Sequence, residues 1–531
     1  MKQNEVNMLA YDIEDVIEQN DIKIPNYDVQ RVIKQTDLTP TWIHFGGGNI
    51  FRGYIAKIVQ NLLNQELINT GIILAETFDF EIIDKIYKPY NNLTLLVTLN
   101  NHLDKEIITS VTNALKCNDK EDMQILKDAF KNPSLQMVSF TITEKGYALT
   151  DLNHNYFEVI KNDILAGPDN SQHVVSILCG LLLERFNAGQ LPISLVSMDN
   201  CSDNGLKLKH AVITMAKEWQ AKKFVSDDFI AYLQSSNVAF PISMIDKITP
   251  RPAKDIEDQL TAIGLNNMHP ITTSKNTFIA PFVNAEEAEY LVIEDLFPNG
   301  RPPLEQAGVY ITDLDTVRKV ETMKVTTCLN PLHTALAVFG VVLGYNRIFQ
   351  EMQDPQLKIL VEGIGNEGMK VVEDPKIIDP KQFLSEVFDR LNNPFVPDDP
   401  ARIATDTSQK VGIRFGQTIK SYLKADLNLE DLTFIPLAIA GWFRYLLGVD
   451  DNGQKIDLSP DPMLKELQTA MKGLELGQPY NGEIEPILRN EKIFGLDLVT
   501  AGLSQKIETM LKELIMDKGS VKATLKKYCS K

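Results

Sequence analysis

The chain has 531 residues, of which 44% are hydrophobic and 23% are charged, a composition typical of a soluble globular protein. Because this length exceeds what one ordinary hydrophobic core supports, we expect two or three domains. The formal net charge is −18, and no clustered basic block compensates it. Phosphate backbones are bound by grouped lysines and arginines, so the charge pattern argues against nucleic acid as a partner.

Signals for targeting and for metal binding are also missing from the sequence. The start, "MKQNEVNMLAYDIEDVIEQN", lacks the apolar run of a signal peptide, and the apolar run "ALAVFGVVLGY" is shorter than a membrane span. The five cysteines form no CxxC pair, and the seven histidines show no HExxH spacing. We therefore expect a cytoplasmic protein in a reduced compartment, with no membrane association and no metal site.

Short apolar runs alternate with amphipathic stretches over the first 312 residues. Residues 1–35 are polar and predict a helical N-terminal extension. The expected strands that follow are, in order, "WIHF", "GIILAETFD", "LTLLVTL", the start of "LQMVSFTITEKGYAL", and "ISLVSMDN". Strands that alternate with helices predict a mainly parallel sheet with helices on both faces, and hence an α/β domain over residues 36–312. Long helical patterns after that point predict an all-α domain over residues 313–531.

A glycine turn follows the first of these strands. Gly46, Gly47 and Gly48 separate "WIHF" from a helix that starts near Asn49. Such a turn lets backbone N–H groups and a helix N-terminus approach a pyrophosphate, although three glycines alone also fit a plain tight turn. The strand–turn–helix context favours a Rossmann-type dinucleotide site, with Arg52 in the first helical turn as a further candidate contact.

Acidic residues at strand ends are candidates for the rest of the cofactor site. Glu76 ends the second strand, where a carboxylate commonly binds ribose hydroxyls, and the neighbouring Asp79 is an alternative for the same role. A carboxylate there repels a 2′-phosphate, so we expect NAD rather than NADP. Thr143 and Glu144, which follow the fourth strand, are also cofactor-binding candidates.

Lys324 opens a stretch, "KVTTCLNPLHTALAVFG", that places polar groups before an apolar helix. A lysine with a lowered pKa is a candidate general base, and Asn330 can donate a hydrogen bond to a developing alkoxide. His333 lies one turn after Asn330, and Glu321 lies one turn before the lysine, where it could pair with it or pass its proton. The alternatives are a solvated Lys–Glu pair and a capping or core histidine.

Several motifs occur together and in order: "GGGNIFRG", "TITEKGY", "SMDNCSDNG", "FPISMIDKITP", "EDLFPNGRPPLEQAGV", "KVTTCLNPLH" and "RIATDTSQK". In this series the chain resembles the polyol-specific long-chain dehydrogenases over roughly residues 40 to 520. The resemblance implies an NAD(P)-dependent, metal-independent oxidoreductase with a Rossmann-type N-terminal domain and a helical C-terminal domain.

The resemblance also implies roles for individual residues. Five match the groups that handle the reacting oxygen and its proton, namely the general base Lys324, the amides Asn330 and Asn200, the orienting His333, and Glu321 of the proton path. Three match groups that contact the rest of the substrate, namely Asp246, Arg402 and Lys410.

The spacing after Lys324 departs from the family pattern Lys-x4-Asn-x2-His. Here five residues separate Lys324 from Asn330, and on a regular helix one added residue rotates all that follows by about 100°. Lys324 and His333 would then point in roughly opposite directions. A π-bulge absorbs one residue, and Pro331 lacks the N–H that an uninterrupted helix needs. We therefore predict a bulge or a break between Lys324 and Pro331.

The expected activity is NAD(H)-dependent interconversion of D-fructuronate and D-mannonate, because the chain resembles the hexuronate branch of the family most. Mannitol 2-dehydrogenase and tagaturonate reductase activities stay open, and so does a non-catalytic NAD-binding regulator. The substrate would be a small sugar acid or polyol, and the protein a monomer or weak homodimer.

Overall fold

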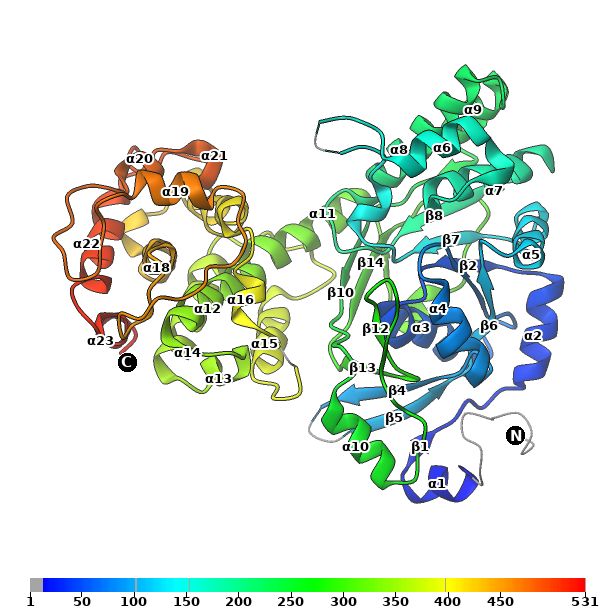
Figure 1. Ribbon diagram of the computed structural model, residues 1–531, viewed down its shortest axis with the longest axis horizontal. Coiled ribbons are helices and arrows are strands. Elements are labelled where there is room, and N and C mark those ends of the chain that lie inside the picture. Colours follow the sequence, from blue (N-terminus) through cyan, green and yellow to red (C-terminus); the bar gives the residue numbers. More distant parts are fainter. Residues whose placement is uncertain (1–12, 101–102, 152, 397, 531) are drawn as a thin grey trace. The chain divides into compact units, whose positions relative to one another are not determined.

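The computed structural model describes residues 13–100, 103–151, 153–396 and 398–530. The chain divides into two compact units, the first ending at Val317 and the second beginning at Arg318 (Figure 1). Each unit has its own secondary-structure class, so they are described separately.

The first unit is built on a six-stranded sheet in which every neighbouring pair of strands is parallel. The strands are β2 (Trp42–Phe45), β3 (Ile72–Glu76), β6 (Val111–Lys116), β7 (Met137–Phe140), β8 (Ile193–Ser197) and β9 (Val238–Ala239). Their spatial order, β6-β3-β2-β7-β8-β9, is the order 3-2-1-4-5-6 of a Rossmann sheet. The predicted α/β class of the N-terminal domain is confirmed.

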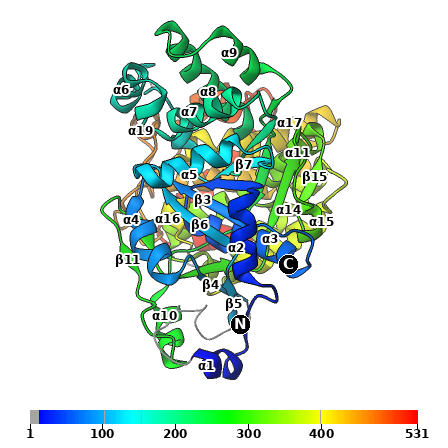
Figure 2. The same ribbon diagram turned by 90° about the vertical axis from the view of Figure 1, so that its right-hand side faces the viewer.

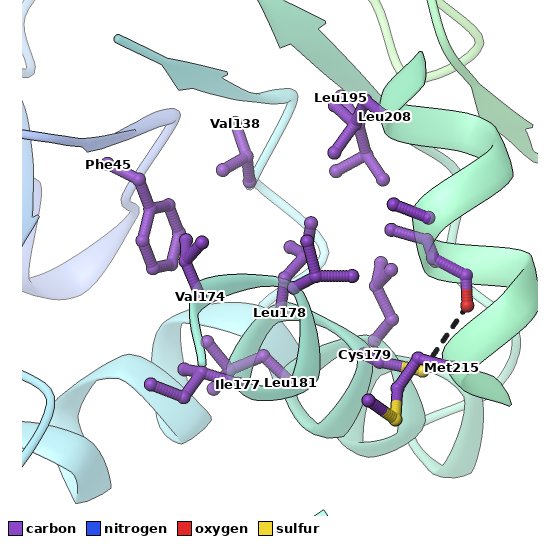
Figure 3. Close-up of a cluster of buried hydrophobic side chains, with 14 of the residues drawn as sticks. Phe45, Val138, Val174, Ile177, Leu178, Cys179, Leu181, Leu195, Leu208 and Met215 are labelled. Carbon is purple, nitrogen blue, oxygen red and sulfur yellow. Dashed lines mark hydrogen bonds between the residues drawn. The ribbon is translucent and has the colours of Figure 1, made fainter. Parts of the chain in front are cut away.

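Helices cover one face of this sheet. They are α5 (Lys120–Lys131), α7 (Val174–Asn187), α8 (Asn204–Ala221) and α9 (Asp227–Gln234). Figure 3 shows Val138 and Leu195 of the sheet lying toward Leu178 on α7. These side chains are all buried, and complete burial of one such aliphatic side chain contributes about 1.5–3 kcal/mol to folding.

The other face packs on α3 (Ala56–Asn64) and on two smaller sheets. Side chains alternate between the two faces with the period of two expected of strands: Ile43 and Phe45 join the helix-covered cluster, whereas Trp42 joins the opposite one. Both faces are therefore buried, as parallel sheets require.

The expected third strand, "LTLLVTL", is not part of the parallel sheet, so its assignment there is wrong. It forms β4 (Thr94–Leu99), which pairs antiparallel with β5 (Leu103–Ile108) in a four-stranded mixed sheet. The other strands of that sheet are β1 (Ile22–Lys23) and β13 (Phe282–Glu286). The third position of the Rossmann sheet belongs to β6, whose sequence "VTNALK" carries only three apolar residues.

The remaining elements of the first unit are small. β10 (Ser243–Asp246), β14 (Tyr290–Glu294) and β15 (Tyr310–Thr312) form a three-stranded sheet, and β11 (Ile271–Thr272) and β12 (Phe278–Ile279) form a hairpin. The helices are α1 (Ile13–Gln19), α2 (Val29–Leu38), α4 (Phe80–Ile82), α6 (Glu158–Ala166) and α10 (Lys254–Ala262). Residues 1–12 of the predicted helical extension lie outside the described residues, and the rest of it contributes α1, β1 and the start of α2.

The second unit is helical, as predicted. Helix α11 (Leu314–Met323) leads into it from the first unit, and the isolated bridge between Val449 and Lys455 is its β structure within the described residues. The helices are α12 (Asn330–Leu343), α13 (Ile348–Met352), α14 (Pro355–Met369), α15 (Pro380–Leu391), α16 (Pro400–Ile403), α17 (Gln417–Lys424), α18 (Phe434–Leu446), α19 (Leu464–Ala470), α20 (Glu485–Leu488), α21 (Glu491–Phe494), α22 (Ser504–Leu514) and α23 (Ser520–Tyr528).

Helix α12 is the central helix of this unit and contacts α14, α16 and α18. The largely helical segment Leu314–Leu343 is long and apolar enough to cross a membrane by length and composition, but 72% of its most apolar window is buried inside the protein. Burial of this kind is typical of a core helix.

Candidate functional site

The glycine turn between β2 and α3 is tightly packed at Gly46 and open at Gly48. Gly46 has φ of +106°, and a Cβ added there would lie 2.3 Å from the carbonyl oxygen of Thr141. A side chain at position 46 is thus excluded both by backbone conformation and by contact. A Cβ added at Gly48 would meet no atom within 4 Å, so the turn opens into free space beside the helix that follows.

Glu76, at the end of β3, is bonded to the backbone around it. Its Oε2 accepts a hydrogen bond from the N–H of Gly47 at 2.9 Å. Its Oε1 accepts from the backbone N–H groups of Thr77, Phe78 and Asp79 at 3.0, 2.9 and 3.2 Å. Three of the four donors converge on Oε1, which is thereby fully engaged, and one binds Oε2. Glu76 therefore fixes the glycine turn and the loop after β3 relative to each other.

Asp79 is the second carboxylate at this end of the sheet, and its side chain is bonded to a hydroxyl instead of to backbone N–H groups. It is 3% exposed, and its Oδ2 accepts a hydrogen bond from the hydroxyl of Thr273 at 2.5 Å. Its Oδ1 is buried and has no hydrogen-bond partner among the described residues. An unsatisfied buried carboxylate oxygen is costly, and a bound donor such as a ribose hydroxyl would satisfy it.

A pocket with a volume of ≈ 1480 Å³ joins these groups, all within the first unit. It is larger than the roughly 300–1,000 Å³ of common small-molecule sites, so it accommodates an extended ligand. Of the predicted cofactor-binding residues, Gly46, Gly47, Gly48, Glu76 and Thr143 line it. The open space at Gly48 and the unpartnered oxygen of Asp79 both fit a dinucleotide.

Three other predicted cofactor residues lie outside the pocket wall. The Oδ1 atom of Asn49, at the start of the helix, is buried without a partner among the described residues. Glu144 forms an ion pair with Lys207 at 2.6 Å. Arg52 is 1% exposed, donates from Nε to Thr94 at 3.2 Å and lies 5.8 Å from the Tyr87 ring centroid.

Arg52 is a buried cation. Burial lowers the pKa of its guanidinium to about 10, so it stays charged at neutral pH. Tyr87, the ring it covers, donates its hydroxyl to the carbonyl of Gly47 at 2.9 Å. The positive charge therefore lies behind the glycine turn, and direct contact of Arg52 with a pyrophosphate stays a prediction.

Asp199 ties together the loops after β7 and β8. Its carboxylate accepts from the backbone N–H groups of Ile142 and Thr143 at 3.1 and 2.8 Å, and from the Tyr147 hydroxyl at 2.5 Å. These bonds hold Thr143 at φ +64°, a conformation that non-glycine residues rarely adopt and that is common at functional sites. The candidate Asn200 directly follows this anchor.

Asp246 ends β10, and the residue after it is fixed by an ion-pair network. Lys247 donates to the carbonyl of Glu286 at 2.5 Å and pairs with Glu289 at 2.8 Å, which also pairs with Lys57 at 3.2 Å. The end of the strand that carries Asp246 is therefore held in one position.

The predicted interruption after Lys324 is confirmed in the second unit. Residues Lys324–Cys328 form a π-helical turn, in which the N–H of Leu329 bonds to the carbonyl of Lys324, five residues earlier, at 3.1 Å. Leu329 then leaves helical geometry, with φ −123° and ψ −61°, and α12 begins at Asn330 with Pro331 in its first turn. The wide turn takes up the extra residue, so Lys324 and His333 are separated by about 80° of helical rotation instead of about 180°.

His333 faces charged side chains of its own unit. Its Nε2 lies 3.6 Å from Asp398 Oδ2, too far for a hydrogen bond, and has no hydrogen-bond partner among the described residues. Burial lowers the pKa of His333 to about 4; the Asp398 charge opposes this shift, and Arg390, Arg402 and Arg414 add to it. The imidazole is therefore neutral at pH 7 and can donate or accept a hydrogen bond.

The cations around His333 differ in how they are held. Arg402 pairs with Asp398 at 2.8 Å, and Arg414 donates to the Thr334 hydroxyl at 2.5 Å. Lys410 donates to the carbonyl of Thr405, and burial together with the charge of Arg414 lowers its pKa. The structure thus brings the predicted Arg402 into the charged surroundings of the predicted His333 and places Lys410 near Arg414 and Arg402, where an anionic group would be favoured.

Two residues of the site, Asp398 and Thr273, were not predicted from the sequence. Asp398 stands next to Asp399, the N-cap of α16, in "DDPAR", and Thr273 lies in a loop with no motif. Their roles depend on contacts with residues distant in sequence. Across the described ranges, no three His, Cys, Asp or Glu side chains are placed to hold a metal ion.

Comparison with known proteins places these features in a family. Residues 40–306 match the mannitol dehydrogenase Rossmann domain, and residues 316–515 match the mannitol dehydrogenase C-terminal domain. The chain is 52% identical to the D-mannonate oxidoreductase of Thermotoga maritima, and the match covers 92% of each chain.

Two solved structures share the fold of this chain. A substrate-free D-sorbitol dehydrogenase has a TM-score of 0.80 at 23% identity, covering 95% of this chain and 97% of that one. Mannitol 2-dehydrogenase of Pseudomonas fluorescens, in a ternary complex with NAD and D-mannitol, has a TM-score of 0.68 at 25% identity, covering 97% and 98%. The resemblance drawn from the sequence motifs is confirmed, and the chain belongs to the mannitol dehydrogenase family.

Proposed function

We propose that the protein is an NAD(H)-dependent oxidoreductase that interconverts D-fructuronate and D-mannonate. The observation that carries the proposal is the set of cations around a neutral His333, namely Arg390, Arg402 and Arg414, with Lys410 near Arg414, in a chain 52% identical to a D-mannonate oxidoreductase. D-mannonate and D-fructuronate each carry a carboxylate where mannitol and fructose carry a primary alcohol, and arginine is the residue best suited to bind that group.

The catalytic residues proposed in the second unit act on the reacting oxygen. Lys324 takes the hydroxyl proton of the alcohol, and in the opposite direction it returns a proton to the ketone oxygen. Asn330 donates a hydrogen bond to the same oxygen as negative charge develops, and neutral His333 orients the neighbouring hydroxyl. Glu321, one turn before the lysine, passes the proton between Lys324 and solvent. When bound, the nicotinamide accepts or supplies the hydride.

In the first unit, we propose that Asn200 supplies a second amide to the substrate oxygen and that Asp246 contacts a hydroxyl. For the cofactor, we propose that Asp79 rather than Glu76 binds the adenosine ribose, because four backbone donors already occupy Glu76. The two adjacent carboxylates disfavour a 2′-phosphate, which supports NAD over NADP. We further propose a cytoplasmic monomer or weak homodimer.

The test is NADH oxidation by the purified protein with D-fructuronate, D-tagaturonate and D-fructose. We expect the highest kcat/KM with D-fructuronate. Replacing Lys324 with methionine, which keeps most of the side-chain volume but has no ionisable amine, is expected to lower kcat by about 10²–10⁴-fold while NADH still binds. Full activity of the Lys324→Met variant would remove the lysine from the mechanism.

The same assay separates the alternatives. Preference for D-tagaturonate or D-fructose would assign tagaturonate reductase or mannitol 2-dehydrogenase activity. The second of these has support from the solved mannitol 2-dehydrogenase. NADH binding without turnover of any of the three substrates would favour a regulatory protein.

A further inference from the structure

The β11–β12 hairpin lies across the loop that follows β3. Thr273, in the hairpin loop 273–277, bonds to Asp79, which is 194 residues earlier in the chain, and the backbone N–H of Ser274 bonds to Glu81 at 3.0 Å. Figure 2 shows β11 beside α4, the short helix that begins directly after Asp79. Two hydrogen bonds therefore join segments that belong to different parts of the fold.

The hydrogen bonds of Thr273 leave one direction for its hydroxyl proton. Its Oγ1 accepts from the backbone N–H of Thr277 at 3.1 Å, and the backbone N–H of Thr273 bonds back to the carbonyl of Thr277 at 3.0 Å. The hydroxyl consequently donates to Asp79 Oδ2, and the residue Thr273 as a whole is 3% exposed. This bond fixes the rotation of the Asp79 carboxylate. The other oxygen, Oδ1, accepts no hydrogen bond from the described residues and is therefore the one available to a ligand.

The hairpin loop also reaches the rim of the nucleotide pocket. Lys275 and Thr277 line the pocket, and the Lys275 ammonium lies 5.0 Å from the centroid of the Phe78 ring. Phe78 is 64% exposed, which is unusual for a large aromatic side chain next to a buried carboxylate. The same short loop thus contacts the pocket at Asp79 and at Phe78.

We propose that Thr273 is a positioning residue for the cofactor: it orients Asp79 so that Oδ1 receives the hydroxyls of the adenosine ribose, and loop 273–277 forms one wall of the adenosine subsite. This rests on the proposed use of NAD. A carboxylate whose rotation is fixed in advance loses less conformational freedom when it binds a diol. Thr273 acts through Asp79 and makes no contact with the reacting atoms.

The experiment compares two Thr→Val variants one residue apart. Thr273→Val removes the hydroxyl and keeps the shape, whereas Thr272→Val makes the same change at an exposed position of the same hairpin. Dissociation constants are measured by fluorescence titration for NADH, for ADP-ribose, and for reduced nicotinamide mononucleotide, which lacks the adenosine half.

For Thr273→Val we expect NADH and ADP-ribose to bind about 10-fold more weakly, the factor that corresponds to one hydrogen bond to a charged group. Binding of the mononucleotide should stay within about twofold, and Thr272→Val should match the native protein for all three ligands. Unchanged NADH binding by Thr273→Val would overturn the proposal. Equal weakening of the mononucleotide would also overturn it, because a general fold defect would then explain the loss.

A double-mutant cycle tests whether Thr273 works through Asp79. Asp79→Asn should weaken NADH binding, and adding Thr273→Val to that variant should change it by less than about twofold. Independent, additive losses would contradict the positioning role. Because these experiments measure cofactor binding, they stay interpretable if the protein does not turn over D-fructuronate. That failure would contradict the proposed reaction alone.

Discussion

At the scale of single residues, Glu351 is a carboxyl group whose pKa departs strongly from its usual value. It lies on α13, fully buried, and neither carboxylate oxygen has a hydrogen-bond partner among the described residues. A Cβ added to Gly340 on α12 would lie 1.9 Å from its Oε1, so the carboxyl occupies the space above that glycine. Burial raises the pKa of Glu351 well above its usual range, and the Asp354 charge adds to the shift.

We predict that Glu351→Gln makes the protein more stable at alkaline pH. The folded-state pKa is raised, so the stability due to the protonated carboxyl is fully present below the unfolded pKa and is lost as pH rises toward the folded one. Glutamine has no proton to lose, so its advantage should grow by up to about 1.4 kcal/mol per pH unit.

Thermal unfolding of Glu351→Gln and the native protein at pH 5, 6.5 and 8 measures this trend. Glu373→Gln, at an exposed position of the same unit, serves as the control and should show no pH-dependent difference. A constant difference between Glu351→Gln and native protein across the three pH values would contradict the prediction.

The residue scale also shows where sequence reasoning ends. The sequence favours Glu76 for the ribose because it ends the second strand, and it leaves Asp79, three residues later, only as an alternative. The distinction comes from four backbone N–H groups that converge on Glu76 and from one hydroxyl, that of Thr273, that reaches Asp79. Such hydrogen-bond partners are known only once the chain is folded.

At the scale of elements, the π-turn at Lys324–Cys328 could be predicted from the number of residues between Lys324 and Asn330. One residue more than the family spacing requires a fixed angular correction, and few local structures supply it. The same logic failed for "LTLLVTL". An apolar strand fits a central parallel position and a buried hairpin equally well, and β6, at the edge of its sheet, carries too few apolar residues to stand out.

We predict that deleting Val325, inside the π-turn, is tolerated. The shortened segment restores the four-residue spacing, and an ordinary α-turn then leaves Lys324 and His333 at the same angular separation as before, about 80°. Activity should stay within about tenfold of native. An alanine inserted after Val325 rotates α12 by about a further 100° and should lower kcat by more than about 10²-fold.

Circular dichroism and NADH titration of both length variants check that the fold and cofactor binding persist. If the deletion is as inactive as the insertion, the wide turn has a role of its own and does more than absorb one residue.

At the scale of the whole molecule, each unit contains a buried histidine that is neutral at pH 7. In the first unit, His44 lies 4.4 Å from Phe51, and its ring nitrogens contact Ser139 and Thr141 at 2.6 and 2.8 Å. Burial lowers its pKa to about 3. In the second unit, burial is also the main reason that the pKa of His333 is lowered to about 4.

We predict that stability falls as pH drops from 6.5 toward 4, before most carboxylates are protonated. An unfolded histidine takes up a proton near pH 6.5 and the folded ones do not, so each contributes a loss of up to about 1.4 kcal/mol per pH unit over this range. The contribution of the two neutral histidines to stability is fully present above pH 6.5.

Chemical unfolding between pH 4 and 7.5 measures the slope, which should be shallower in His44→Gln than in the native protein. His154→Gln, at an exposed position, should keep the native slope. Parallel curves for all three proteins would assign the acid sensitivity to other groups.

The four hydrogen bonds that Glu76 accepts from backbone N–H groups also bear on coenzyme engineering. A common route to an NADP-dependent enzyme exchanges the acidic residue at the end of the second Rossmann strand for a neutral or basic one. Here that exchange would leave the N–H groups of Gly47, Thr77, Phe78 and Asp79 without their acceptor together and loosen the glycine turn. Coenzyme redesign in this scaffold should therefore start from Asp79 and the hairpin loop above it, and leave Glu76 in place.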